Sequence, residues 1–439
     1  MSHEASRQMH LLGFFPGTHS YTLWSNPQAG SQITFESFRE FASIAHEGLF
    51  DAMFLAEGLR VHESNGNIID HSVQDRPDNI TRFSALAAAI PELGLISTLN
   101  ASHNEPIDVA RRFATLDQLS GGRAGWNVVM ASDDLIGANF RQGRLDNWDA
   151  RYERGSEFLE ITKRLWGADG TGQTGAGARF DGQHFQLDTD FRFPASPQGR
   201  PVIVQAGDSF AGRDFATKHA DAIFTGRVED EFEADITARL RAHGRDRADL
   251  RILSSVTVIL GATTREAEER AEAEHRARMN PRVVISALED AWGRDLSDHD
   301  VHGPLPEGPP TPGHIPSPRM LGRSVDSPRN ADELVQRWRD IAAELELTST
   351  GLVTRLLRRH GDGALIGTPD MVAARLTDWF ESGVVDGFVL APAVLPGGLG
   401  EFVEHLVPRL QARGVFRTRY EGSTLRDHLG LPVPSLTPA

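Results

Sequence analysis

The chain has 439 residues, no cysteine and a formal net charge of −16. Without cysteine it has no disulfide, no thiolate nucleophile and no cysteine-ligated metal or iron–sulfur centre. The excess of acidic residues argues against nonspecific binding to nucleic acid and against anchoring on anionic membranes. No apolar run reaches transmembrane length, and the polar first ten residues lack the core of a signal peptide, so we expect a cytoplasmic protein.

Short segments with the composition of β-strands recur along the chain, and most are followed by longer segments with helical periodicity. Eight strand segments are predicted, at residues 11–15, 52–56, 93–99, 124–130, 201–206, 221–225, 252–260 and 386–391. This alternation is typical of a parallel sheet with covered faces, either closed as a barrel or open as a doubly wound sheet. Because the strand count is that of a (β/α)8 barrel, we predict an α/β fold of the TIM-barrel type.

Apolar residues between these strands mark one face of each intervening helix. After the first strand, Phe38 and Phe41 recur at helical spacing, and after the third strand Ala110 and Ala114 do so. The second pattern ends at Gly121, where a glycine is expected just beyond a helix.

One insertion departs from the strand and helix alternation. Residues 304–318 contain seven prolines and fit neither a helix nor a central strand. They lie within an insertion at residues 281–330, between the seventh and eighth strands, which is either a lid over the catalytic end of the barrel or a disordered surface loop. We treat residues 1–439 as a single barrel domain, in which residues 414–439 form a C-terminal extension.

A polar residue interrupts the fourth predicted strand. Side chains alternate between the two faces of a strand, so Gly125 and Asn127 point to one side and Trp126 and Val128 to the other. Small and polar residues suit the interior of a barrel, which predicts that Asn127 points inward. A buried amide needs hydrogen-bond partners. These are either neighbouring backbone groups or the pyrimidine edge of a flavin, where two carbonyls flank an N–H group.

The fifth strand leads into a candidate anion site. It is followed by Gly207 and Ser209 in a turn, and then by a helix with Gly212 in its first turn. Free backbone N–H groups and the helix dipole converge at such a helix start, and phosphate sites late in the strand order are common in barrels. Ser209 therefore either contributes to a phosphate site, for example for FMN, or serves only as the N-cap of the helix.

Four other residues lie where the active end of a barrel is expected. Glu57 comes just past the second strand and Phe54 lies within it, while Phe14 lies in the first strand and His19 follows that strand. Aromatic residues with one histidine can line an apolar substrate pocket. We therefore assign Phe14 and Phe54 to substrate binding and consider His19 a candidate catalytic residue, although a histidine in a loop is more often a surface residue.

Several familiar catalytic motifs are missing from the sequence. We find no GxGxxG opening a helix after the first strand, no P-loop, no HEXXH, no GXSXG nucleophile elbow and no HXH pair on the first strand. We therefore expect no metal site and assign the chemistry largely to an organic cofactor.

Six sequence blocks together resemble the bacterial-luciferase-like flavin monooxygenases, and within them the nitrilotriacetate and dibenzothiophene-sulfone monooxygenase group. The blocks are GLFDAMFLAEGL, NEPIDVARRFATLDQLSGGRAGWNVV, DARYERGSEFLEITKRLW, QAGDSFAGRDFATKHADAIFT, GTPDMVAARLTDWFESGVVDGFVLAP and GVFRTRYEGSTLRDHLGL. The resemblance extends from residue 10 to residue 431. It implies a (β/α)8 barrel, a homodimer or homotetramer, and FMN that a separate NAD(P)H:flavin reductase supplies in reduced form by diffusion.

The resemblance also implies roles for individual residues. Asn127 lies beside the isoalloxazine, while Tyr152 and Ser209 hold the ribityl phosphate with the backbone of Gly212. Glu57 stands where this group more often has aspartate in a flavin contact, and His19 aligns with a histidine of the sulfone-oxidising relatives. Further departures from the family pattern are Met130, Trp148 and the stretch Asn100, Ala101 and Ser102.

The reaction that the resemblance implies is oxygenation of a small organic substrate by O₂ and reduced FMN through a flavin peroxide. The N-terminal aromatic residues favour an apolar or aromatic substrate over a tricarboxylate, for which convergent arginines are expected. Two other functions fit the same sequence: a barrel oxidoreductase that transfers hydride with a deazaflavin, and a flavin-binding protein without catalytic activity.

Overall fold

The computed structural model describes residues 7–17, 22–60, 63–64, 67–68, 76–131, 134–140, 148–167, 178–191, 193, 196–316, 330–356 and 364–434. Eight parallel strands form a closed barrel in the order β1 (His10–Phe15), β2 (Ala52–Leu55), β5 (Gly94–Asn100), β6 (Ala124–Val129), β9 (Val202–Ala206), β10 (Ala222–Thr225), β11 (Arg251–Leu260) and β13 (Gly387–Leu390), which pairs back with β1. Each predicted strand segment overlaps one of these strands, with bounds that agree to within one residue at either end, which confirms the (β/α)8 barrel.

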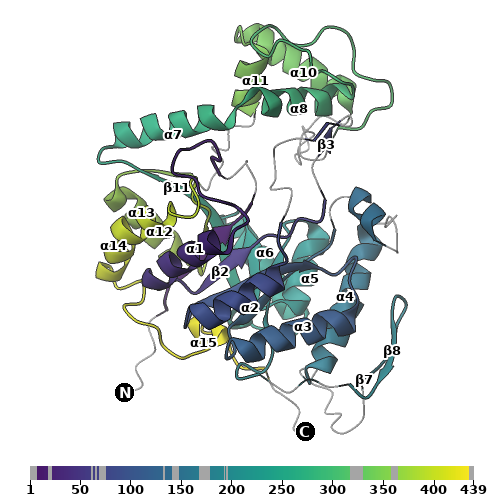
Figure 1. Ribbon diagram of the computed structural model, residues 1–439, viewed down its shortest axis with the longest axis vertical. Coiled ribbons are helices and arrows are strands. Elements are labelled where there is room, and N and C mark those ends of the chain that lie inside the picture. Colours follow the sequence, from purple (N-terminus) through teal and green to yellow (C-terminus); the bar gives the residue numbers. More distant parts are fainter. Residues whose placement is uncertain are drawn as a thin grey trace.

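Helices surround the barrel and cover the outer face of its strands (Figure 1). They are α1 (Phe35–Glu47), α2 (Asn79–Ala89), α3 (Pro106–Leu119), α4 (Trp148–Leu165), α5 (Phe210–His219), α6 (Asp230–Ala242), α7 (Thr264–Arg278), α12 (Pro369–Ser382), α13 (Leu399–His405) and α14 (Val407–Ala412). The chain leaves α3 through Gly121 and Gly122, both at positive φ (68° and 89°), which a residue with a Cβ rarely adopts. The predicted helix end at Gly121 is therefore confirmed.

Shorter strands lie outside the barrel. They form the hairpins β3 (Glu63–Ser64) with β4 (Asn67–Ile68) and β7 (Ala178–Asp181) with β8 (Gln186–Thr189). The sequence analysis did not predict β12 (Ala364–Gly367), which pairs with the second half of β11, beyond the part of that strand that belongs to the barrel.

The alternation of side chains along the strands creates two separate hydrophobic cores. The outer core lies between strands and helices; in it Trp126 of β6 stacks on Phe113 of α3, with ring centroids 5.2 Å apart, and packs near Trp166. The inner core fills the barrel and includes Leu12, Ile96, Val204, Leu253 and Val389. The outward orientation of Trp126 agrees with the sequence-based assignment of strand faces.

The C-terminal segment closes the barrel at the N-terminal ends of the strands. The short helix α15 (Leu425–His428) brings Leu425 and Leu429 into the inner core, where both are fully buried. Beside it, Arg426 donates to Asp221, which also accepts from Arg200 at 2.6 and 2.9 Å. Burial alone would raise the pKa of Asp221, but the two guanidinium groups outweigh it and hold that pKa well below its usual range. The predicted C-terminal extension is thus a structural part of the barrel.

The insertion after the seventh barrel strand forms a helical unit with its own core. Helices α8 (Pro281–Trp292), α10 (Ala331–Glu344) and α11 (Ser349–Leu356) pack around Trp292 and Trp338 and stand beyond the barrel in Figure 1. The proline-rich residues up to 316 are anchored on this unit, because Thr311 bonds to the carbonyl oxygen of Trp292 (2.8 Å) and His314 to that of Asp290 (2.6 Å). The insertion is therefore longer than the predicted residues 281–330, of which residues 317–329 lie outside the described part of the chain.

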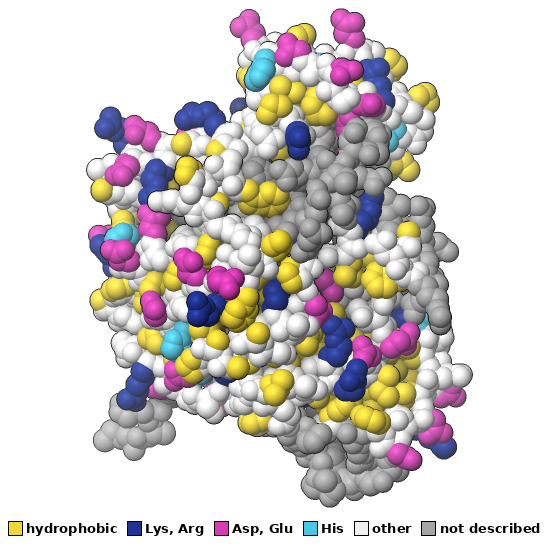
Figure 2. Space-filling model, in the orientation of Figure 1, with side chains coloured by type: hydrophobic (Ala, Val, Ile, Leu, Met, Phe, Trp, Pro, Cys, Tyr) yellow, Lys and Arg dark blue, Asp and Glu magenta, His cyan; other side chains and the backbone are white. Residues whose placement is uncertain are grey.

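The surface carries charges of both signs. On the face shown in Figure 2, acidic and basic side chains are interspersed among polar and apolar ones. Within the described residues, no helix combines the length and the apolar character that crossing a membrane requires.

The burial of Leu425 in the inner core predicts that this side chain contributes to the free energy of unfolding. Replacing Leu425 by alanine removes a fully buried side chain from the floor of the barrel and leaves a cavity, so the free energy of unfolding should fall by about 2–5 kcal/mol. Urea denaturation followed by circular dichroism measures this change. Leu119→Ala is the matched control, because Leu119 is 63% exposed and its loss should change stability by less than about 0.5 kcal/mol. Equal effects of the two variants would contradict the assigned role of α15.

Candidate active site

Asn127 faces the barrel interior near the carboxyl end of β6. In the register of the strands it lies between Thr98 of β5 and Val204 of β9. Its Nδ2 group donates to Thr98 Oγ1 at 3.0 Å, and its side chain is 3% exposed. Its Oδ1 atom is buried and has no hydrogen-bond partner among the described residues. A buried acceptor without a donor is costly, so this atom calls for an N–H group from outside the protein.

The imide of a flavin is a suitable donor for this unpartnered acceptor. The pyrimidine edge of an isoalloxazine carries one N–H between two carbonyls, and Asn127 Oδ1 can accept from that N–H. The bond to Thr98 fixes the amide with its oxygen as the free atom. The alternative that neighbouring backbone groups satisfy both ends of the amide does not hold for Oδ1 among the described residues.

The turn after β9 forms a cradle of the kind that binds phosphate. Ser209 is the N-cap of α5, and its Oγ accepts from the backbone N–H of Gly212 at 3.0 Å. A Cβ placed on Gly212 would lie 3.0 Å from Ser209 Oγ, from the carbonyl oxygen of Gly207 and from Tyr152 Oη. The structure therefore brings together four residues that the sequence analysis assigned to the cofactor. The capping bond leaves the Ser209 hydroxyl hydrogen and the first N–H groups of α5 available to an anion.

Glu57 lies just beyond the end of β2, next to the end of β5. One of its carboxylate oxygens accepts from both the backbone N–H and the side-chain Nδ2 of Asn100, each at 3.0 Å. Burial raises the pKa of Glu57 to about 7, although these two bonds from Asn100 lower it. The carboxyl group can therefore gain or lose a proton near neutral pH.

Asn100, Ser102 and Met130, which depart from the family pattern, each contact a neighbouring segment. Asn100 Oδ1 accepts from the backbone N–H of His103 at 2.8 Å, and Ser102 Oγ accepts from that of Ala131 at 2.9 Å. Met130 packs against Gly155 of α4 so closely that a Cβ there has no room. Trp148 begins α4, but its side chain lies outside the described part of the chain.

Aromatic side chains fill the inner core below the mouth of the barrel. Phe14 of β1 stacks on Phe54 of β2, with ring centroids 4.7 Å apart and an interplanar angle of 22°. Phe224 of β10 meets Phe54 edge to face at 5.7 Å and is less buried than the other two. The sequence analysis missed Phe224, although its position on the inner face of a predicted strand could have identified it.

Two residues remain to be placed: Thr98, which was not predicted, and His19, which was. Thr98 was also missed, and the two-residue period of Ile96, Thr98 and Asn100 along β5 is the pattern that could have placed it beside Asn127. His19, the candidate catalytic residue, lies outside the described part of the chain.

Comparison with known proteins identifies the family. The sequence model of the luciferase-like monooxygenase family matches residues 14–386. The chain belongs to the luciferase-like monooxygenase family. It is 35% identical to dibenzothiophene-sulfone monooxygenase of Rhodococcus erythropolis (strain XP) and 33% identical to nitrilotriacetate monooxygenase component A of Aminobacter aminovorans. In both comparisons the match covers 98% of each chain, which confirms the group that the sequence blocks indicated.

A solved structure of another relative contains a flavin. The relative is a riboflavin lyase that was solved with modified FMN and its substrate riboflavin. The present chain superposes on it with a TM-score of 0.75. The two chains are 26% identical, and the alignment covers 97% of each. The relative therefore shares the fold over nearly the whole chain.

The protonation of Glu57 predicts a pH dependence of stability. Its pKa is about 7 in the folded protein and 4.5 without the fold, so the folded state binds the proton more tightly, and its stability falls as the pH rises from 4.5 to 7. Glu57→Gln keeps an acceptor for Asn100 and removes the titration. Relative to the parent protein, the variant should gain up to about 3 kcal/mol between pH 4 and pH 8.

Urea denaturation at several pH values checks this prediction. Glu231→Gln, at an exposed position of α6, is the control and should follow the curve of the parent protein. A Glu57→Gln curve parallel to the parent curve would show that Glu57 does not titrate in this range.

Proposed function

We propose that this protein is an FMN-dependent monooxygenase that oxygenates a small apolar or aromatic molecule with O₂, using reduced FMN from a separate flavin reductase. The observation that carries the proposal is the buried Asn127 Oδ1, which has no donor among the described residues while Thr98 holds the other end of the amide. The family membership and the flavin-bound relative support the same cofactor.

Two neighbouring strands carry the residues that we assign to the isoalloxazine and to the phosphate of FMN. Asn127 on β6 is paired with Val204 on β9, and β9 leads directly into the turn with Gly207 and Ser209. We assign the isoalloxazine to Asn127, and the ribityl phosphate to Ser209, Tyr152 and the backbone around Gly207 and Gly212. Glu57 is assigned to the rim of the flavin site, where its longer side chain reaches Asn100.

When bound, reduced FMN supplies the two electrons with which O₂ oxygenates the substrate and forms water. The protein's own residues orient the cofactor and keep water out. Phe14, Phe54 and Phe224 make the interior below the mouth apolar. Glu57 can hold or release a proton near neutral pH beside the site. His19 is proposed as the acid, base or hydrogen-bond donor toward the substrate, on the strength of the family resemblance.

The helical unit is proposed as a cover of the site. Helix α8 contacts the β3–β4 hairpin, which follows β2 at the carboxyl end of the barrel. The insertion therefore lies on the side where Asn127, Glu57 and Ser209 gather. Exclusion of water by such a cover suits the oxygenation chemistry, because an open site would waste reducing equivalents.

An aromatic substrate is favoured by the arginines as well as by the phenylalanines. Near the mouth, Arg76 donates to the carbonyl oxygen of Gly17 (2.7 Å), Arg151 to that of Ala131 (2.7 Å) and Arg154 to that of Ala101 (3.3 Å). These side chains hold loops together, whereas a polycarboxylate requires arginines that converge on the ligand.

The proposed need for a reductase is supported by the sequence, in which we find no dinucleotide-binding fingerprint after the first strand. We propose that reduced FMN reaches the site by diffusion from a reductase. The family resemblance also makes a homodimer or homotetramer our expectation for the assembly.

The activity can be tested with photoreduced FMN in the absence of any reductase. The protein is titrated anaerobically with reduced FMN, and then mixed with ¹⁸O₂ and dibenzothiophene sulfone, with nitrilotriacetate in a parallel reaction. We expect saturable binding and incorporation of one ¹⁸O atom into the aromatic sulfone. With NADH and oxidised FMN, turnover should require an added flavin reductase. Binding without oxygenation of any substrate would favour a flavin-binding protein, and oxidation of NADH without a reductase would contradict the two-component assignment.

The orientation of Asn127 predicts a specific loss of flavin affinity. N3-methyl-FMN lacks the N–H that Asn127 Oδ1 should accept, so it should bind the parent protein about tenfold or more weakly than FMN. Thr98→Val removes the partner of Asn127 Nδ2, frees the amide to rotate and should shrink that difference. Thr98→Ser keeps the hydroxyl and is the matched control. Fluorescence titration measures all six affinities, and equal binding of the two flavins by the parent protein would refute the contact.

A further inference from the structure

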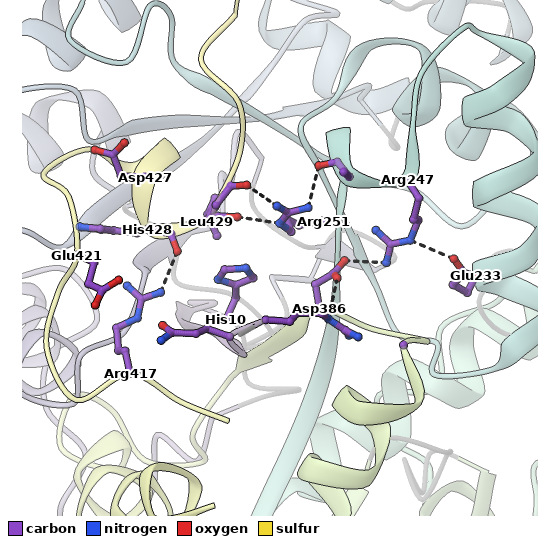
Figure 3. A pocket seen from close by; sticks show the side chains of 15 residues that line it. His10, Glu233, Arg247, Arg251, Asp386, Arg417, Glu421, Asp427, His428 and Leu429 are labelled. Carbon is purple, nitrogen blue, oxygen red and sulfur yellow. Dashed lines mark hydrogen bonds and ion pairs between the residues drawn. The ribbon is translucent and has the colours of Figure 1, made fainter. Parts of the chain in front are cut away.

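A second pocket lies at the opposite end of the barrel from the candidate active site. It has a volume of about 830 Å³, and it is built where β1, β11 and β13 begin. Figure 3 shows His10 in its centre, the C-terminal residues Arg417, His428 and Leu429 on one side, and Arg251, Arg247 and Asp386 on the other. Nothing in the proposed oxygenation uses this pocket.

The acidic side chains of the pocket already have donors. Asp386 accepts from Arg247 and from the backbone N–H of Ile252, each at 2.8 Å. Glu233 accepts from Arg247 at 3.1 Å, and Asp427 accepts from the backbone N–H groups of residues 423 and 424. Behind the pocket wall, Asp51 accepts from His10, from the backbone of Leu11 and from Arg417. Glu421, the remaining acidic residue of the lining, forms an ion pair with Arg419 at 3.8 Å, so each of these carboxylates has at least one partner.

One basic side chain of the pocket, Arg417, is less well satisfied. Arg417 is 4% exposed and gives Nη2 to Asp51 (2.5 Å) and to the carbonyl oxygen of His428 (2.9 Å). Its Nε and Nη1 atoms are buried and have no hydrogen-bond partner among the described residues. Two guanidinium N–H sites thus lack acceptors, which is costly at a buried position.

Arg251 adds a positive charge whose hydrogen bonds all go to backbone carbonyl oxygens. Its three nitrogen atoms donate to the backbone carbonyls of Leu429 (2.7 Å), Ala248 (2.9 Å) and Gly430 (2.5 Å). It forms no ion pair with any carboxylate in the part of the chain that the structure describes. The pocket therefore lacks acceptors at Arg417 and has no carboxylate bonded to Arg251 among the described residues, while both ring nitrogens of His428 also lack a hydrogen-bond partner there.

We propose that this pocket binds an oxyanion, carried by a small molecule with a phosphate or carboxylate group. Guanidinium groups pair with the oxygens of both groups through directed N–H bonds. The pocket volume leaves room for the rest of such a molecule, and His10 in its centre adds a ring nitrogen to the contact surface. The site is independent of the phosphate cradle at Ser209, which lies at the other end of the strands.

Charge changes at the rim test the proposal without disturbing the arginines. Gln8 and Ala248 line the pocket, and neither is buried. Gln8→Glu is isosteric and adds one negative charge. Ala248→Glu adds a negative charge beside Arg251, and Ala248→Gln is its neutral control. Each glutamate should repel an oxyanion and compete for the free N–H groups.

Binding is measured by isothermal titration calorimetry with inorganic phosphate, and in parallel with citrate, at low ionic strength. We expect Gln8→Glu and Ala248→Glu to weaken binding about tenfold or more, and Ala248→Gln to bind like the parent protein. Ser209→Ala should leave this binding event unchanged, because it alters only the cradle at the other end. The tighter of the two probes then identifies the anionic group that the pocket selects.

Two results would overturn the proposal. One is the absence of any phosphate or citrate binding that survives in Ser209→Ala. The other is binding that is equally strong in Gln8→Glu, Ala248→Glu and the parent protein. Thermal melting of every variant without ligand shows whether a loss of binding reflects unfolding. Neither result bears on the oxygenase activity, which is measured separately with reduced FMN.

Discussion

Each strand of a closed parallel barrel has to suit two environments, because alternate side chains face the inner core and the surrounding helices. β6 shows the constraint in six residues: Trp126 and Val128 pack outward among helices, while Gly125 and Asn127 face the interior. The interior has room for few polar groups, and each must be bonded. An asparagine that keeps one unpartnered oxygen in this setting is therefore informative about a ligand.

Buried carboxyl groups are stabilised in different ways at the two ends of the barrel. At the N-terminal ends of the strands, buried carboxylates such as Asp221 and Asp51 are held by arginines from distant parts of the chain, and these pairs fix the C-terminal segment against the barrel. At the carboxyl ends, Glu57 accepts hydrogen bonds from two N–H groups of Asn100, and burial raises its pKa. Ion pairs thus stabilise the fold at one end, whereas the carboxyl group of Glu57 at the other end can change its protonation state.

Local patterns in the sequence predicted the features that depend on neighbouring residues. The two-residue period of β6 placed Asn127 inward, and the order of strand, turn and helix placed Ser209 at the start of α5. Features that depend on distant residues could not be predicted in this way. Arg426 and Asp221 are 205 positions apart, and no local period connects them. Thr98 becomes significant only once β5 is known to pair with β6 in a particular register.

The helical unit escaped prediction for a related physical reason. The prolines predicted a loop, which is correct for residues 304–316. Helices α8, α10 and α11 lie on both sides of that loop in the sequence and pack together around Trp292 and Trp338. A local composition cannot reveal which helices will share a core. The same holds for α15, whose leucines complete a core that is otherwise made of strands.

The closure of the barrel has a consequence for how the protein is synthesised. β1 pairs with β13, and the inner core needs Leu425 and Leu429 from the last described helix. While a ribosome is still translating these segments, the first strand has one free edge and the interior lacks its floor. The half-made barrel therefore exposes both an unpaired strand and apolar side chains, the combination that chaperones bind and that promotes aggregation. The C-terminal segment therefore has to be synthesised before the barrel can close and bury this surface.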